Sequence, residues 1–172
     1  CGFNPHLLDI GGGFPGEDAV GSAPFAEIAA SINAALSEHF PEDGKLQVIG
    51  EPGRFFAYSA FTLACNIIGK KQLRRSAAPA GESAVAAASA GTIACSYTIS
   101  DGLYGSFNCL LYDHAVARPV PLRVDGDGHL ADYVLTTVFG PTCDGMDNVC
   151  KEVLLPPDLS PGQDWLLFEG MG

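Results

Sequence analysis

The stretch LLDIGGGFPG, residues 7–16, places three adjacent glycines directly after an apolar run. Glycine has no Cβ and adopts positive φ readily, so such a triplet lets the backbone turn sharply and approach a bulky group. The apolar run HLLDI predicts a short buried strand. The glycines after it predict either a loose turn or a loop whose backbone holds an anion.

Regular structure returns after this loop. Residues 25–40 repeat apolar side chains at three- and four-residue steps, which predicts one face of a helix that the PEDG at 41–44 ends. The segment LQVIGEPGRFF, residues 46–56, predicts a second apolar strand that runs into another glycine-containing turn. This order is typical of a parallel β/α architecture. In a (β/α)8 barrel both loops would lie on the C-terminal rim, where active sites are found.

The sequence changes character after residue 57. The stretches AYSAFTLACNIIGKK (57–71), CSYTISDG (95–102) and DYVLTTVFG (132–140) are rich in β-forming residues and are separated by turn signals. They predict a second, antiparallel domain, a β-sandwich or barrel. Between the first two, the Ala/Ser/Gly-rich residues 76–95 predict a flexible insertion, with an alanine helix as the alternative.

The expected organisation therefore has two parts. Residues 1–57 would form the last strands and a helix of a β/α barrel, and residues 58–172 a C-terminal β domain. The chain begins at Cys1 without an initiating Met, and we expect it to be a piece of a longer polypeptide.

Composition limits the possible partners and location. The net charge of −11 and a pI near 4.5 disfavour nucleic acid, because its binding rests on clustered Lys and Arg. No run of about 18 apolar residues predicts a membrane span. The six cysteines form no C-x-x-C pair and no spacing typical of zinc. Reduced thiols in a cytoplasmic protein are the expected state.

The motif GGGFPG also satisfies the dinucleotide fingerprint G-x-G-x-x-G at Gly11, Gly13 and Gly16. That fingerprint requires a helix that opens at the last glycines and an acid at the end of the next strand. Here the predicted helix begins only near Pro24, and Glu38 falls at the end of a helix. The context therefore disfavours a dinucleotide site.

The segment EPGRFF places Glu51 and Arg54 three residues apart at the end of the second predicted strand. A lone carboxylate there is ordinarily a capping or ion-pair residue. Arginine, however, presents a planar fork suited to phosphate, and it would share a rim with the glycine triplet. A carboxylate against a ring nitrogen keeps a pyridine protonated, which is what makes pyridoxal phosphate an electron sink.

Four motifs in order now carry a family resemblance. With LLDIGGGFPG, the stretches EPGRFFAYSAFTLACNIIGKK (51–71), YTISDGLYGSFNCLLYDHA (97–115) and FGPTCDGMDNVC (139–150) resemble the eukaryotic-type ornithine decarboxylases. These are pyridoxal-phosphate enzymes of the alanine racemase-like fold. The resemblance runs from Leu7 to Gly172, except for the low-complexity insertion and residues 118–133.

The resemblance implies a cofactor site at the N-terminal motifs. The amides of Gly11, Gly12 and Gly13 would hold the phosphate of pyridoxal 5'-phosphate, Arg54 would add its charge, and Glu51 would pair with the pyridine nitrogen. The lysine that binds the cofactor as a Schiff base would lie upstream of Cys1, and the tyrosine that touches the phosphate just past Gly172. The four lysines of this chain match no such motif: Lys45, Lys70, Lys71 and Lys151.

The resemblance also implies substrate-binding residues in the C-terminal motifs. Asp113 and Asp144 would receive the distal ammonium of a diamino acid, and Tyr104 would lie near the subunit interface and substrate. Cys143 would reach the neighbouring subunit's site to govern reprotonation at Cα. Without the family, Asp113 would be read as a turn residue and Cys143 as a buried thiol. His114 matches no functional position and is read as structural.

The implied function is decarboxylation of L-ornithine to putrescine, the first step of polyamine biosynthesis, by a homodimer with shared sites. The sequence CDG, where a diaminopimelate-type relative carries CES, favours a cationic distal group. Two alternatives stay open. One is an antizyme inhibitor-like regulator, for which antizyme would be the partner, and the other is a decarboxylase of lysine or arginine, since a methylene changes binding by only about 1–3 kcal/mol.

Overall fold

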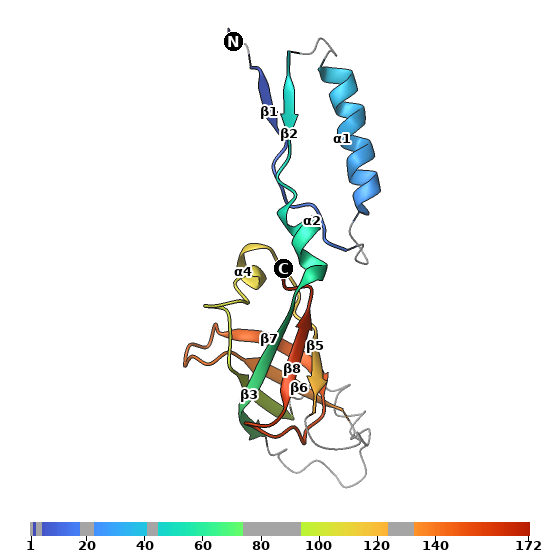
Figure 1. Cartoon of the computed structure of the whole chain (residues 1–172). Coiled ribbons are helices and arrows are strands. Elements are labelled where there is room, and N and C mark those ends of the chain that lie inside the picture. Colours follow the sequence, from blue (N-terminus) through green and yellow to red (C-terminus); the bar gives the residue numbers. More distant parts are fainter. Residues whose placement is uncertain (1, 3–4, 18–22, 41–44, 74–93, 124–132) are drawn as a thin grey trace. The chain divides into compact units, whose positions relative to one another are not determined.

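A computed structural model gives the fold of the chain (Figure 1). The residues it describes are 2, 5–17, 23–40, 45–73, 94–123 and 133–172. They divide into two compact units, the first made of residues 1–62 and 170–172, and the second of residues 63–169. No described helix is both long enough and apolar enough to cross a bilayer.

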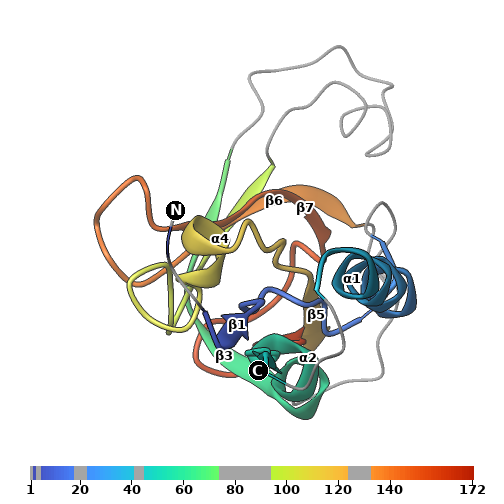
Figure 2. The ribbon, with the colours of Figure 1, turned by 90° about the horizontal axis from the view of Figure 1, so that it is seen from above.

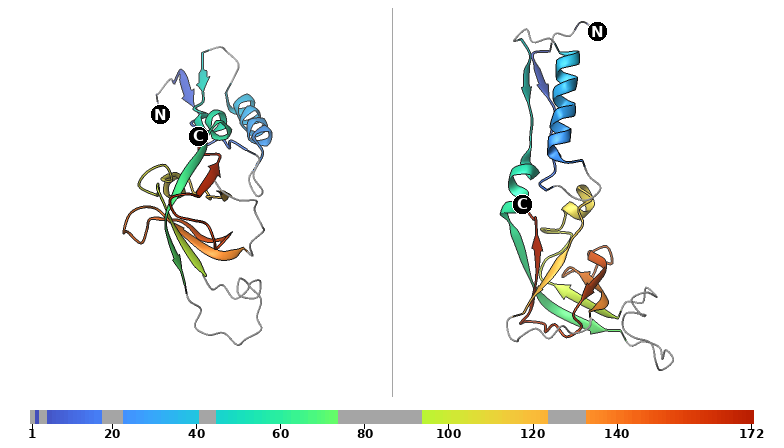
Figure 3. Two further views of the ribbon diagram at one scale, coloured as in Figure 1. Left: turned by 60° about the horizontal axis from the view of Figure 1, so that its bottom comes forward. Right: turned by 90° about the vertical axis from the view of Figure 1, so that its right-hand side faces the viewer.

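The first unit is a strand–helix–strand arrangement. Strand β1 (Leu7–Asp9) and strand β2 (Gln47–Ile49) pair in parallel, and helix α1 (Phe25–His39) connects them. Figures 1 and 3 both show α1 running alongside the two strands. The predicted helix and the parallel β/α order are confirmed, because a parallel pair requires such a crossover. The complete barrel stays a prediction.

The strand around residues 7–9 is less buried than expected. Leu7 is 47% exposed and Ile49 on β2 is 44% exposed. Within the described residues this sheet has only two strands, so each is paired along a single edge and is covered incompletely. The prediction of a buried strand is therefore wrong for the chain as described.

The second strand is also shorter than predicted. It ends at Ile49, and the segment expected to continue as strand and turn forms helix α2 (Gly53–Ala57), followed by the 3-10 helix η1 (Tyr58–Ala60). Pro52 precedes α2 with φ −79°, and proline is well suited to the start of a helix because its missing N–H would have no helical partner. On α2, Phe55 stacks on Phe25 of α1 with ring centroids 4.3 Å apart.

The second unit is built on a six-stranded sheet in the order β5-β8-β3-β4-β6-β7. Its strands are β3 (Thr62–Gln72), β4 (Cys95–Ile99), β5 (Pro119–Leu122), β6 (Val134–Phe139), β7 (Asn148–Leu155) and β8 (Trp165–Glu169). The short helix α4 (Cys109–Tyr112) lies between β4 and β5 in the chain. Figure 2 shows the strands following a curved path, so the sheet is curled. The three β-rich stretches predicted from sequence coincide with β3, β4 and β6.

One strand pair corrects the prediction of a purely antiparallel domain. Strands β4 and β6 run parallel, from Cys95↔Thr136 to Thr98↔Phe139, whereas β3–β4, β5–β8 and β6–β7 are antiparallel. Between Ile99 and Val134 the chain leaves the sheet, forms α4 and places β5 at the far edge. Because it crosses over before returning, it re-enters beside β4 in the same direction, and the sheet is mixed.

The core of this unit lies on the inner face of the curled sheet. Alternate residues of the strands are buried, as the two-residue period of a strand requires. Phe107 and Phe168 meet edge to face with centroids 4.7 Å apart. Other core side chains are Ile67, Tyr97, Ile99, Val138, Leu155 and Leu166. Their burial comes from strands far apart in sequence.

Most of the predicted Ala-rich insertion lies outside the described residues, which resume at Ala94. Its last residue, Cys95, is the first residue of β4 and is fully buried. The insertion therefore ends before residue 95. Part of the segment without family resemblance, residues 119–122, forms β5 with prolines at two alternate positions.

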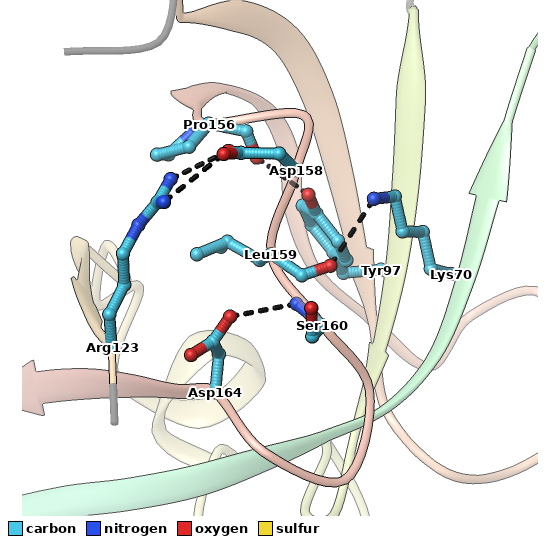
Figure 4. Close-up of polar contacts among 8 residues, drawn as sticks. All are labelled: Lys70, Tyr97, Arg123, Pro156, Asp158, Leu159, Ser160 and Asp164. Atoms are coloured by element: carbon cyan, nitrogen blue, oxygen red, sulfur yellow. Dashed lines mark hydrogen bonds and ion pairs between the residues drawn. The ribbon is translucent and has the colours of Figure 1, made fainter. Parts of the chain in front are cut away.

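Side chains from strands β3 and β4 form hydrogen bonds to the connection between β7 and β8, residues 156–164. Figure 4 shows the side chains that hold it. The Tyr97 hydroxyl donates a buried 2.6 Å hydrogen bond to the carbonyl of Pro156, and Lys70 Nζ donates to the carbonyl of Leu159 at 3.3 Å. Leu159 is fully buried. Strands β3 and β4 thus each supply one side chain that holds the connection in place.

Two carboxylates within the connection also stabilise it. Arg123 binds Asp158 through both guanidinium nitrogens, at 2.6 and 3.1 Å. Asp164 Oδ2 accepts the N–H of Ser160 at 2.8 Å inside the connection itself. Both contacts are drawn in Figure 4. The ion pair between Arg123 and Asp158 is bidentate. This is a stronger form of ion pair, because two parallel hydrogen bonds fix the orientation of the guanidinium relative to the carboxylate.

Candidate functional site

In the first unit, the two predicted loops lie against each other. The N–H of Ile10 donates to Ile49 at 2.9 Å, and the N–H of Glu51 donates to the carbonyl of Gly11 at 2.7 Å. These bonds continue the β1–β2 ladder beyond the strands. A Cβ on Gly12 would lie 2.5 Å from the Glu51 carbonyl oxygen, so only glycine permits this approach. The glycine loop and the β2 turn therefore share the carboxyl edge of the pair.

Backbone conformation explains two of the three glycines. Gly11 and Gly13 have φ of +71° and +82°, which residues with a Cβ rarely adopt. The N–H of Gly11 donates to Asp9 Oδ1 at 2.8 Å. The family resemblance implies that all three amides hold the cofactor phosphate. Because the N–H of Gly11 already donates to the Asp9 carboxylate, the N–H groups of Gly12 and Gly13 are the candidates for binding an anion.

Glu51 and Arg54 lie next to this loop. Glu51 lies two residues after the end of β2, and its carbonyl accepts the N–H of Gly53 at 2.8 Å. Arg54 is the second residue of α2. Gly16, at the end of the glycine loop, packs closely on Tyr58 and on the Arg54 backbone. Amide donors, a guanidinium and a carboxylate thus come from one edge, a set of groups that fits a phosphate next to a protonated ring nitrogen.

In the second unit, two loops meet through Tyr104 and Asp144. The loop after β4, residues 102–108, carries Tyr104, whose hydroxyl donates to Asp144 Oδ2 at 2.5 Å. Asp144, on the β6–β7 loop at residues 140–147, also accepts the N–H of Met146 at Oδ1, 2.9 Å away. The hydrogen bond to Asp144 raises the pKa of Tyr104. The hydrogen bonds from Tyr104 and Met146 lower the pKa of Asp144, so the carboxylate is ionised at neutral pH.

The remaining predicted residues are exposed. Cys143 is an exposed free thiol directly beside Asp144. Asp113 follows α4 as its C-cap, its N–H donating to the carbonyl of Cys109 at 3.0 Å, and it is exposed. His114 next to it has φ +53°. The structure thus brings together Tyr104 and Asp144, places Cys143 on the same loop, and puts Asp113 at the end of a neighbouring helix.

The sequence prediction missed a buried carboxylate, Asp147, behind this pair of loops. Asp147 is fully buried. Its Oδ1 accepts the N–H of Leu103 at 2.8 Å, and its Oδ2 accepts both the N–H and the hydroxyl of Thr142, at 3.0 and 2.7 Å. One side chain therefore holds the Tyr104 loop and the Cys143–Asp144 loop together.

Two glycines make room for this carboxylate. A Cβ on either Gly102 or Gly140 would collide with the Asp147 side chain. Burial pushes the pKa of Asp147 upward, but the hydrogen bonds from Thr142 and Leu103 outweigh it and leave the pKa below its usual value. The motif TCDGMDN contains this acid, yet only the contact between residues 44 positions apart reveals its role.

Five cysteines lie among the described residues, and none of them forms a disulfide there: Cys65, Cys95, Cys109, Cys143 and Cys150. Burial raises the pKa of Cys65 to about 11 and that of Cys150 to about 12. Protonated buried thiols react poorly, so the exposed Cys143 stands apart. Among the described residues no group of His, Cys, Asp and Glu is arranged to hold a metal ion.

The chain is similar to curated proteins over nearly its whole length. The chain is 46% identical to the ornithine decarboxylase of Cricetulus griseus and 44% identical to antizyme inhibitor 2 of Xenopus laevis, in each case over 99% of this chain and 35% of the relative. The chain therefore spans about a third of the length of these curated relatives.

A solved structure and a family model show the same relationship. The arginine decarboxylase of Paramecium bursaria Chlorella virus, bound to agmatine, superposes with a TM-score of 0.72 at 32% identity, covering 99% of this chain and 39% of that one. The family model described as pyridoxal-dependent decarboxylase, C-terminal sheet domain, matches residues 19–172. Motifs, fold and comparisons together show that this chain belongs to the pyridoxal-dependent decarboxylases, whose C-terminal sheet domain it carries.

Proposed function

We propose that the full-length protein containing this chain is a pyridoxal-phosphate-dependent decarboxylase that converts L-ornithine to putrescine, as the first step of polyamine biosynthesis. The observation that carries this proposal is the Tyr104–Asp144 hydrogen bond beside the free Cys143 thiol. It puts an ionised acid and an exposed thiol on one loop, in a chain 46% identical to a protein named ornithine decarboxylase.

The first unit would hold the cofactor. The amides of Gly12 and Gly13 would bind the phosphate together with Arg54, and the Glu51 carboxylate would keep a proton on the ring nitrogen. When bound, pyridoxal phosphate supplies an electron sink for the electron pair left as CO2 departs. The protein groups supply orientation and charge. The close approach of Gly12 to the Glu51 backbone supports this assignment.

The second unit would recognise the substrate. Asp144 and Asp113 would receive the distal ammonium, because a site that offers carboxylate acceptors to an ammonium group discriminates against a substrate that lacks the charge. Tyr104 holds the Asp144 carboxylate in one orientation. Cys143, adjacent to this acid, would donate the proton that Cα receives after CO2 is lost.

We further propose that the protein is a cytoplasmic homodimer with shared active sites. Large side chains with apolar surface are exposed on α4, in the segment between α4 and β5 and on the β6–β7 loop: Tyr112 is 80% exposed, Val116 77% and Met146 63%. Such exposure is typical of a protein interface. The free state of the described cysteines fits a reducing compartment.

Carbon dioxide release from L-ornithine labelled at its carboxyl carbon tests the activity. We expect the full-length protein to release it and the Cys143→Ala variant to lose most of that activity. Cys109→Ala, which removes a partly exposed thiol outside the candidate site, is the matched control and should stay active. Full activity in Cys143→Ala would contradict the role of this thiol, and no release by the wild-type protein would contradict the proposed reaction.

Mixing two inactive variants tests the shared site. Arg54→Ala removes a group from the first unit and Cys143→Ala one from the second. If each site takes Cys143 from the neighbouring subunit, mixed dimers contain one intact site, and an equal mixture should regain about a quarter of wild-type activity. A mixture that stays as inactive as its components, although the subunits exchange, would show that sites are not shared.

A second function is favoured by the similarity to antizyme inhibitor 2. An antizyme inhibitor-like regulator would bind antizyme without catalysing decarboxylation. Absorbance of bound pyridoxal phosphate in the full-length protein separates the two, because a colourless protein that captures antizyme would be the regulator. Lysine and arginine belong in the same assay, since the similar viral structure is an arginine decarboxylase. The substrate with the highest kcat/KM then identifies the specificity.

A further inference from the structure

We propose that Asp147 is a positioning residue of the candidate site: its buried carboxylate sets the distance between the loop that carries Tyr104 and the loop that carries Cys143 and Asp144. This inference rests on the proposed function for its catalytic consequence. The loop contacts themselves do not depend on it.

The carboxylate bridges the two loops at both oxygens. Oδ1 accepts from Leu103, the residue before Tyr104, and Oδ2 accepts twice from Thr142, the residue before Cys143. Each partner is thus one position from a predicted site residue. A small displacement of either partner would move the neighbouring side chain directly.

The backbone of Asp147 reinforces this arrangement. Its N–H donates to the carbonyl of Asp144 at 3.0 Å, and its carbonyl accepts the N–H of Gly140 at 2.8 Å. The side chain and backbone of one residue therefore close the loop from Gly140 to Asp147 on itself. The carboxylate then ties this closed loop to Leu103.

Only an aspartate satisfies these contacts. An asparagine has a single acceptor oxygen, so its amide nitrogen would face the N–H of either Leu103 or Thr142, donor against donor. A glutamate is longer by one methylene, and the Asp147 carboxylate is already enclosed by Gly102 and Gly140, where no Cβ fits. A buried donor without an acceptor costs more than the hydrogen bond it loses, so the loops would separate.

The outer contact depends on this inner one. Tyr104 and Asp144 are exposed, and an exposed hydrogen bond between two loops persists only while the loops are held at the right separation. The buried Asp147 carboxylate holds the loops at that separation through its bonds to Leu103 and Thr142. The orientation of the Asp144 carboxylate, and with it the predicted binding of a distal ammonium, is thus set by a residue that need not touch the substrate.

The Asp147→Asn variant tests the proposal, and Asp164→Asn is its matched control. Asp164 is also a buried carboxylate that accepts a loop N–H, but it lies in the β7–β8 connection. Thr142→Val, which removes one donor and leaves the charge, serves as a second and milder variant should Asp147→Asn fail to fold. Thr142→Ser keeps the hydroxyl and should behave like the wild type.

Hydrogen exchange in the full-length protein gives a readout that needs no substrate. In Asp147→Asn we expect faster exchange at residues 103–106 and 142–146 together, with residues 156–164 unchanged. Asp164→Asn should give the opposite pattern. If residues 103–106 keep their protection when Asp147 is changed, the carboxylate does not join the loops and the proposal is wrong.

Steady-state kinetics gives the catalytic readout. We expect Asp147→Asn to raise the KM for ornithine roughly tenfold or more, and Asp164→Asn to leave it unchanged at a comparable loss of thermal stability. An unchanged KM in Asp147→Asn would overturn the positioning role. A wild-type protein that is inactive on ornithine would count against the proposed function, and the exchange result would still decide whether Asp147 links the loops.

Discussion

Gly12 approaches Glu51 so closely that a single methyl group would separate them. Gly12→Ala would place a Cβ 2.5 Å from the Glu51 carbonyl oxygen. We expect this variant to lose about 1–3 kcal/mol of stability, as overpacked sites do, and to bind pyridoxal phosphate more weakly, because the two loops must move apart. Thermal unfolding and cofactor titration of the full-length protein measure both effects.

Gly53→Ala is the control for this change. Gly53 begins α2, a Cβ there meets nothing within 4 Å, and its φ is not positive. Alanine is a better helix former than glycine, so this variant should be as stable as the wild type or slightly more stable. Equal behaviour of the two variants would mean that the approach of Gly12 to Glu51 is not tight in solution.

Thiol exposure predicts an order of chemical modification. Treated with iodoacetamide near pH 8, Cys143 should be alkylated well before Cys65 and Cys150. Burial raises the pKa values of those two thiols to about 11 and 12, which keeps them protonated, and the thiolate is the nucleophile. Peptide mapping by mass spectrometry at successive times gives the order. Early labelling of Cys150 in the folded protein would contradict the burial described for it.

The buried hydroxyl of Tyr97 predicts a stability difference between two tyrosines. Tyr97→Phe removes the donor to the Pro156 carbonyl and leaves that oxygen without it, which should cost about 1–3 kcal/mol. Tyr112→Phe, at an exposed position, should change stability by less than about 0.5 kcal/mol. Denaturant midpoints of the two variants test this. Equal midpoints would show that the β7–β8 connection is not held through Tyr97.

Asp147 predicts a pH dependence. Its pKa in the folded state lies below the ordinary value of 3.8, so its stabilising contribution is complete above that value and is lost as pH falls through the folded-state pKa. The difference in melting temperature between the wild type and Asp147→Asn should therefore be largest near neutral pH and shrink below about pH 4. A difference that stays constant down to pH 3 would contradict an ionised, hydrogen-bonded Asp147.

Helices and strands could be predicted where their signal lies in neighbouring residues. The apolar side chains spaced along residues 25–39 predicted α1, and the β-forming residues 95–99 predicted β4. The predicted end of β2 was wrong, because the segment that begins at Pro52 forms the first turn of helix α2 instead of continuing the strand. The direction of β6 could not be predicted, since it depends on where the chain crosses between Ile99 and Val134.

The candidate site shows the same division. The glycine triplet and Glu51 could be placed on one edge because parallel strands end together. Asp147 could not be recognised, because its importance comes from Leu103 and from two glycines that leave space for it. Such a role has no local signature. A buried charge is recognised only by what surrounds it.

The parallel pairing of β4 with β6 also bears on how fast the sheet unit can form. Cys95 and Thr136 become neighbours only after an intervening loop of some forty residues has been closed, and the entropy of closing such loops slows folding. The β6–β7 hairpin has a short connection and can form early. We therefore expect a high contact order for this unit and a nucleus at the β6–β7 hairpin, with β4 docking in a later, rate-limiting step.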